Sequence, residues 1–121
     1  MISKEVVAKA VIKEIKKENK VNNIETGLIR SYANPSKIVW KKSHSGYTPD
    51  IKAISAQGVP VIYEIELSES VNEEKWRLFS LYAAKSKGRF ILVVPETRVK
   101  EMSELIKERN LRNIHFITFQ V

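Results

Sequence analysis

Three acidic residues, Asp50, Glu64 and Glu66, lie in two short segments that the sequence predicts to be neighbouring β-strands. In an extended strand alternate side chains share a face, so Glu64 and Glu66 point to one side while Tyr63 and Ile65 point to the other. Carboxylate oxygens are the ligands that Mg²⁺ and Mn²⁺ prefer. If the segment with Asp50 pairs with the segment with Glu64, the three side chains converge and can share one divalent cation.

The turn between the two segments decides which residues face each other. Residues 50–56 and 59–68 flank Gln57-Gly58, and the second segment is rich in strong β-formers. We therefore expect a β-hairpin. A turn centred on Gln57 sets residues whose numbers sum to 114 opposite each other, which places Asp50 opposite Glu64. Opposing Cβ atoms in such a pair lie about 4.5 to 5.5 Å apart.

A cluster of carboxylates raises its own pKa values and costs stability, so a positive group is expected beside it. Residues 72–87 are predicted to form the next helix, and Lys75 falls within the apolar stripe of that helix. Its ammonium group either reaches water while the alkyl stem packs, or turns towards the carboxylates. Lys52, two residues after Asp50 on the same strand face, is the second candidate for this role.

The stretch Ser45-Gly46-Tyr47-Thr48-Pro49-Asp50-Ile51, followed by Gly58 and by Glu64-Ile65-Glu66, resembles the active-site hairpin of the PD-(D/E)XK nuclease superfamily, and especially its small Holliday-junction-resolvase-like members. The resemblance implies one α/β domain over residues 1–121, with the restriction-endonuclease-like fold. In that fold helices flank a mixed central sheet, and an α-β-β-β-α-β core is followed here by a helix and a strand.

The same resemblance implies a metal-dependent endonuclease that hydrolyses phosphodiester bonds in DNA, including branched DNA. Asp50, Glu64 and the backbone carbonyl of Ile65 would bind Mg²⁺ or Mn²⁺. The implied catalytic residues are Asp50, Glu64, Glu66 and Lys75. The metal would neutralise phosphate charge and lower the pKa of a bound water.

Glu66 departs from the family pattern, which usually has lysine at this position. The superfamily tolerates glutamate there and also lysines moved to the neighbouring helix, a pattern that Lys75 fits. Glu66 would then bind a second metal or act as a base through water, and Lys75 would orient the attacking water or stabilise developing charge. Many relatives also place a glutamate of the first helix at the site, and the sequence leaves both Glu5 and Glu14 open for that part.

The charge of the chain is unevenly distributed. The net charge is +7, with +6 on residues 1–42, −5 on residues 43–74 and +6 on residues 75–121. A basic surface around an acidic segment would attract a polyanion and bring it to a cation site formed by that segment. The expected partner is a nucleic acid, most of all DNA. Contacts between basic side chains and phosphates do not depend on the base sequence. The residues expected to contact it are Lys41, Lys42, His44, Tyr47 and Lys52.

The rest of the chain is expected to supply the scaffold. Residues 2–19 predict an amphipathic helix with Ser3 as its N-cap and with Val7, Ala8, Val11, Ile12 and Ile15 on one stripe. The other predicted elements are strands at 27–33 and 37–41, a loop at 42–49, a helix at 72–87 that ends at Gly88, a buried strand at 89–94, a helix at 97–109 and a strand at 114–121.

Composition excludes several classes of function. The 121 residues include no cysteine, which rules out disulfides, thiolate zinc sites and cysteine nucleophiles. Apolar runs are too short for a membrane helix, and the first residues lack a secretory pattern. We therefore expect a cytoplasmic protein with no membrane partner. A homodimer is a further expectation, because junction resolvases and many restriction enzymes act in pairs.

Two other functions stay open on the sequence alone. One is a non-catalytic nucleic-acid-binding or assembly module that keeps the nuclease fold. The other is a basic α/β protein whose acidic strands form internal ion pairs with Lys52 and Lys75 and which serves protein partners.

Overall fold

The computed structural model describes residues 2–18, 21–41 and 43–120. Within them the chain is a mixed α/β domain with three α-helices and a five-stranded sheet, and none of these helices is long and apolar enough to cross a bilayer. The elements are α1 (Lys4–Lys17), β1 (Val21–Thr26), β2 (Ile38–Val39), β3 (Gly46–Tyr47), β4 (Ile51–Ser55), β5 (Pro60–Ile65), α2 (Glu73–Lys85), β6 (Arg89–Pro95), the 3₁₀ turn η1 (Glu96–Arg98), α3 (Val99–Glu108) and β7 (Ile114–Phe119).

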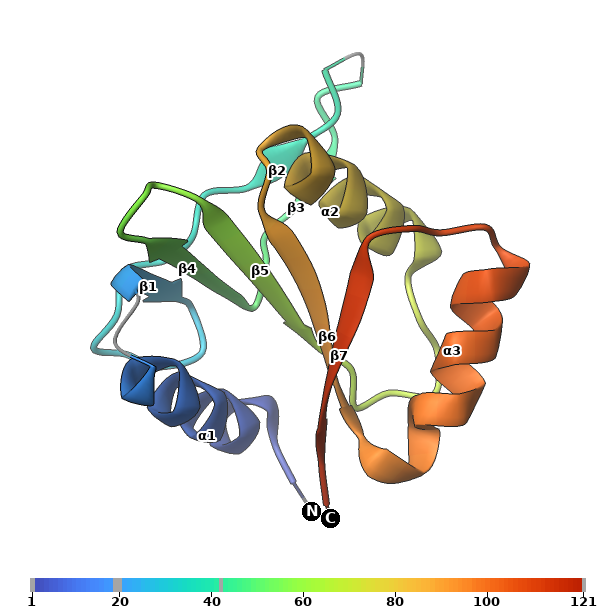
Figure 1. Ribbon diagram of the computed structural model, residues 1–121, viewed down its shortest axis with the longest axis horizontal. Helices are drawn as coiled ribbons and strands as arrows, with labels where there is room; N and C mark the ends of the chain where they lie inside the picture. The colour runs from blue at the N-terminus through green and yellow to red at the C-terminus, as the bar shows by residue number, and fades with distance from the viewer. Residues whose placement is uncertain (1, 19–20, 42, 121) are drawn as a thin grey trace.

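The main sheet has the strand order β1-β4-β5-β6-β7 (Figure 1). β4 pairs antiparallel with both β1 and β5, whereas β5, β6 and β7 are parallel neighbours. Parallel neighbours need a long connection, and α2 and α3 provide it. The expected mixed sheet is confirmed. β2 and β3 form a separate antiparallel hairpin that packs against α2.

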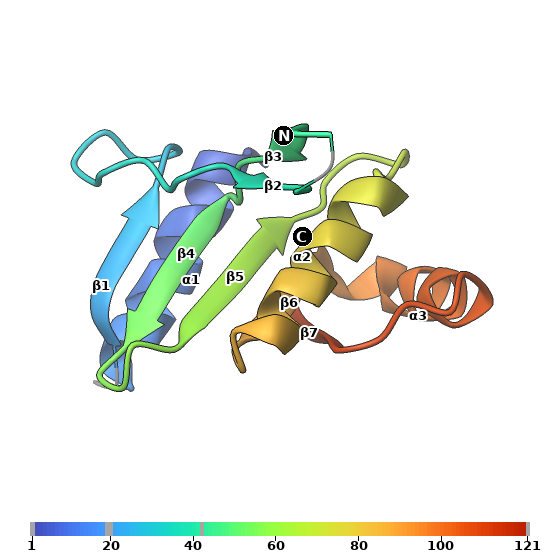
Figure 2. The same ribbon diagram turned by 90° about the horizontal axis from the view of Figure 1, so that it is seen from above.

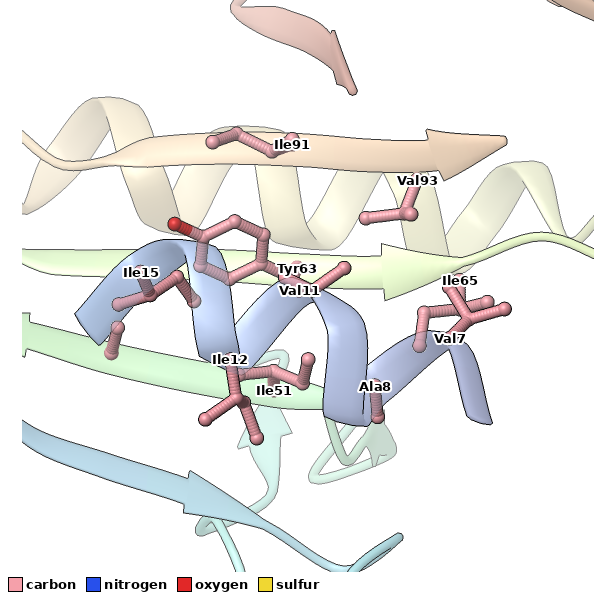
Figure 3. Packing of buried hydrophobic residues seen from close by; sticks show 11 residues of the cluster. Val7, Ala8, Val11, Ile12, Ile15, Ile51, Tyr63, Ile65, Ile91 and Val93 are labelled. Atoms are coloured by element: carbon pink, nitrogen blue, oxygen red, sulfur yellow. The ribbon is translucent and has the colours of Figure 1, made fainter. Parts of the chain in front are cut away.

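Helix α1 covers one face of the sheet. Its first turn is capped as predicted, because the Ser3 hydroxyl accepts a hydrogen bond from the Val6 amide at 3.3 Å. The predicted stripe is the buried face of the helix, and it packs against odd-numbered residues of the strands (Figure 3). The residues in this core include Val7, Ala8, Val11, Ile12, Ile15, Ile51, Tyr63, Ile65, Ile91 and Val93.

Helices α2 and α3 cover the opposite face (Figures 1 and 2). Asn72 caps α2, with its side-chain oxygen accepting from the Lys75 amide at 3.1 Å. Trp76 and Phe79 are fully buried, and the Phe79 ring meets Phe90 edge to face at 5.6 Å between centroids. The even-numbered side of β5 therefore faces α2, and this is the side that carries Glu64.

The predicted strand over residues 27–33 is wrong. Those residues form bends and turns, closed by a hydrogen bond from the Thr26 amide to the Ala33 carbonyl at 2.9 Å, and the strand is β1, which ends at Thr26. The two asparagines of β1 are weak β-formers. Pairing with β4 makes this segment a strand, with Ile24 opposite Ala53.

Two glycines have roles that the local pattern did not show. The predicted loop at 42–49 includes strand β3, where a Cβ on Gly46 would overlap the carbonyl oxygen of Ile38. After α2 the left-handed residue is Lys87, with φ 59°, rather than the predicted cap Gly88. Gly88 instead allows close approach of the chain to the Pro60 carbonyl.

Candidate active site

The hairpin of β4 and β5 brings Asp50 and Glu64 together. Ile51 lies opposite Tyr63 and Lys52 opposite Ile62, which is the predicted register. Just beyond the last pair, the Asp50 amide donates to Oε1 of Glu64 at 3.2 Å, and Oδ2 of Asp50 accepts from the Ile65 amide at 2.8 Å. The two carboxylates are thus held side by side where the hairpin opens.

Asp50 is also tied to two elements outside the hairpin. The Lys4 ammonium at the start of α1 lies 3.0 Å from Oδ2 and 3.3 Å from Oδ1 of Asp50. The Thr26 hydroxyl at the end of β1 donates to the Asp50 carbonyl oxygen at 2.6 Å. Lys4 was not expected at the site, because the position of a lysine in a lysine-rich helix does not indicate which residue it pairs with.

Glu64 is fully buried at the end of β5. Its Oε2 forms an ion pair with the Lys75 ammonium of α2. Of the two orientations open to Lys75, the structure has the inward one. Lys52, the other candidate, lies instead over the ring of Tyr82, with Nζ 5.6 Å from the ring centroid.

The electrostatics of this pair follow from burial. Burial raises the pKa of Glu64, the nearby Asp50 carboxylate raises it further, and Lys75 and Lys4 offset part of the shift, leaving a pKa of about 7. For Lys75, burial lowers the pKa, but the carboxylates of Glu64, Glu66 and Asp50 outweigh it and the net pKa is raised. The balance favours the charged ammonium form of Lys75, which pairs with Glu64.

Glu66 has a different environment from the other two acids. It is buried, and its Oε1 accepts a hydrogen bond from the Trp76 indole at 2.9 Å. In residues 2–18, 21–41 and 43–120 there is no group of three or more acidic, His or Cys side chains arranged to hold a metal. Asp50, Glu64 and Glu66 are therefore not grouped in the described residues as expected from the sequence: Asp50 and Glu64 lie together, and Glu66 contacts Trp76.

The first helix contributes a lysine to the candidate site, whereas the resemblance implied one of its glutamates there. Glu5 pairs with Lys9 at 3.5 Å, and Glu14 pairs with Lys17 at 3.2 Å, on the exposed side of α1. Lys4 therefore stands where the resemblance suggested an acidic group.

Of the residues predicted to contact nucleic acid, Lys41, His44 and Tyr47 belong to the β2–β3 hairpin and its loop, and Lys52 belongs to β4. Lys41 and His44 are exposed, and His44 adopts a left-handed φ of 58°. Tyr47 is half-buried, and its hydroxyl donates to Oε2 of Glu74 at 3.4 Å. Lys42 lies outside the described residues.

The donor set fits a hard divalent cation. Asp50 and Glu64 offer adjacent carboxylates, and each is neutralised by an ammonium group that a bound cation would replace. Oxygen ligands of this kind suit Mg²⁺ or Mn²⁺ better than softer metals.

Comparison with protein-family models, curated proteins and solved structures finds no match to this chain.

Proposed function

We propose that this chain is a divalent-metal-dependent endonuclease with the restriction-endonuclease-like fold, and that it hydrolyses phosphodiester bonds in DNA. The observation that carries the proposal is the convergence of Asp50, Glu64 and Lys75 at one end of the hairpin. Glu64 is fully buried and its pKa is raised to about 7. A strongly shifted pKa of this kind is more typical of a functional site than of a structural core. The +7 charge of the chain suits a polyanionic substrate.

Each side chain has a distinct part in the proposed reaction. Asp50 and Glu64 would hold Mg²⁺ or Mn²⁺, with the Ile65 carbonyl as a further oxygen ligand. When bound, the metal neutralises phosphate charge and lowers the pKa of a water. Lys75, released from Glu64, would stabilise charge that develops on the phosphate oxygens. Glu66, held by Trp76, would help to keep Lys75 charged, since its charge raises the pKa of Lys75.

The test is cleavage of supercoiled and branched DNA with Mg²⁺ or Mn²⁺. Asp50→Asn and Glu64→Gln should each lower the cleavage rate at least about 100-fold, because they remove metal-binding charge. Glu104→Gln, on the exposed side of α3, is the matched control and should cleave like the wild type. Cleavage that persists in EDTA, or in both site variants, would show that another site or a contaminant is responsible.

A second function is favoured by one specific observation. Both carboxylates are already neutralised by lysines, Asp50 by Lys4 and Glu64 by Lys75, as in a site whose ion pairs serve only the fold. The chain would then be a nucleic-acid-binding module without catalysis. Calorimetric titration with Mn²⁺ separates the two functions. A nuclease should bind Mn²⁺ in a way that Asp50→Asn abolishes, whereas a binding module should bind DNA and show no Mn²⁺ binding that depends on Asp50.

A further inference from the structure

An apolar groove runs between α2 and the β2–β3 hairpin. It has a volume of about 990 Å³, and its lining includes Val39, Trp40, Lys41, Leu81, Tyr82 and Lys85. Leu81 is 50% exposed and Val39 45% exposed, so large apolar side chains are left open to water here. An exposed apolar patch of this kind commonly marks a binding surface. We call it the α2 groove.

The charge of the α2 groove selects an anionic occupant. Its described lining includes Lys41 and Lys85 and contains no Asp or Glu. A third lysine, Lys52, is adjacent, with its ammonium 5.6 Å from the centre of the Tyr82 ring. Cations therefore border an apolar floor on which two aromatic rings, Trp40 and Tyr82, are half-exposed.

This combination fits unpaired nucleotides better than a duplex. An unpaired base offers a flat apolar face that stacks on aromatic and aliphatic side chains, while its phosphates contact lysines. A duplex keeps those faces stacked inside the helix and presents phosphates outward, so it gains nothing from exposed Leu81 or Val39. An apolar floor with a basic rim thus matches a single strand.

Helix α2 connects the groove to the candidate active site. Lys75 in its first turn pairs with Glu64, and Tyr82 follows seven residues later, which is about 10 Å along the helix axis. Lys52, two residues after Asp50 in the chain, lies over the Tyr82 ring. A strand lying along α2 can therefore reach both places.

We infer that the α2 groove binds unpaired bases of the strand whose phosphodiester lies at Asp50 and Glu64, so that the substrate carries a single-stranded segment. The binding role of the groove is inferred from the residues that line it, and its link to cleavage rests on the proposed function.

The test compares a labelled strand of about 12 nucleotides with the duplex of the same sequence, by fluorescence anisotropy in EDTA so that no cutting occurs. The strand should bind at least about tenfold tighter than the duplex. Trp40→Ala and Leu81→Ser should each weaken strand binding about tenfold, as loss of base stacking does. Lys85→Glu should weaken strand binding and reduce the slope of log affinity against log salt concentration by about 1, as loss of one phosphate contact does.

The controls lie on other surfaces. Val6→Ser removes a 56% exposed apolar side chain on α1, and Lys100→Glu reverses an exposed charge on α3. Both should bind the strand like the wild type. Leu81 is an exposed position, so Leu81→Ser tests the groove even if Trp40→Ala impairs folding. The inference is overturned if strand and duplex bind with equal affinity. It is also overturned if Leu81→Ser binds the strand as tightly as Val6→Ser does, which is the result expected of a groove that binds an acidic protein segment.

Failure of this inference can be told apart from failure of the proposed nuclease. If the protein cleaves DNA in a metal-dependent way but Leu81→Ser does not change strand binding, the groove assignment is overturned and the proposed nuclease function is not. Strand binding that depends on Leu81, in a protein with no metal-dependent cleavage, supports the groove and overturns the nuclease.

Discussion

The backbone amide of Asp50 donates a hydrogen bond to the side chain of Glu64, at 3.2 Å from Oε1. One carboxylate of the site is thus oriented by the backbone of the other acidic residue, and Asp50 in turn is held by the Ile65 amide at 2.8 Å. Neither side chain can swing away without losing a hydrogen bond in a partly buried place. The pair is therefore arranged before any ligand arrives.

Glu64 should make the stability of the fold depend on pH. Its pKa is raised by burial from 4.5 to about 7, so the folded protein holds this proton more tightly than the unfolded chain does. The stability that Glu64 contributes is then complete below about pH 4.5 and is lost as the pH rises through about 7. We expect the free energy of unfolding to fall by on the order of 2 to 3 kcal/mol over this interval. Urea unfolding in metal-free buffer between pH 4.5 and 8 measures the slope.

Glu64→Gln cannot titrate and should lose this part of the pH slope. Glu104→Gln, exposed on α3, should keep the wild-type slope. A wild-type protein whose stability is level across the interval would contradict the raised pKa.

Trp76→Phe should destabilise the protein through Glu66. The substitution keeps most of the buried ring but removes the indole N–H that lies 2.9 Å from Oε1 of Glu66. A buried carboxylate left without this donor costs about 1 to 3 kcal/mol, in addition to the packing loss. Urea unfolding measures the cost. In the double variant Trp76→Phe with Glu66→Met the two effects should not add, and strictly additive effects would show that the hydrogen bond contributes nothing.

Lys4→Met should tighten binding of a divalent cation. The Lys4 ammonium neutralises Asp50 at 3.0 Å and must leave before a cation can bind there. Its removal also takes away a like charge beside the metal, so the affinity for Mn²⁺ should rise about tenfold by calorimetry. Lys9→Met is the matched control, because Lys9 pairs with the exposed Glu5 on the same helix. Unchanged or weaker Mn²⁺ binding by Lys4→Met would mean that Lys4 does not compete for the site.

Gly46→Ala should open the β2–β3 hairpin while sparing the main sheet. A Cβ at this position would overlap the Ile38 carbonyl oxygen and crowd Val39, which are backbone atoms that cannot move aside singly. We expect faster tryptic cleavage after Lys41 and weaker strand binding in the α2 groove. Gly58→Ala is the comparison, since space around Gly58 is open and only its left-handed φ of 78° opposes the change. Equal cleavage of the two variants would show that the hairpin tolerates the methyl group.

The parts that the sequence alone determined are those encoded over short distances along the chain. The turn at Gln57-Gly58 sets the β4–β5 register and so places Asp50 beside Glu64, because hairpin pairing depends on loop length. The buried stripe of α1 and its cap Ser3 follow equally from local spacing. The proposed catalytic function itself stays a prediction.

The tertiary structure decided the contacts between residues far apart in the chain. Lys4 reaches Asp50 across a separation of 46 residues, and Glu66 turns to Trp76 instead of joining a three-carboxylate site. β1 becomes a strand only because β4 pairs with it, and the α2 groove exists only where the hairpin meets the helix. Such contacts depend on how whole elements pack, and no local pattern of residue types records which lysine will lie beside which acid.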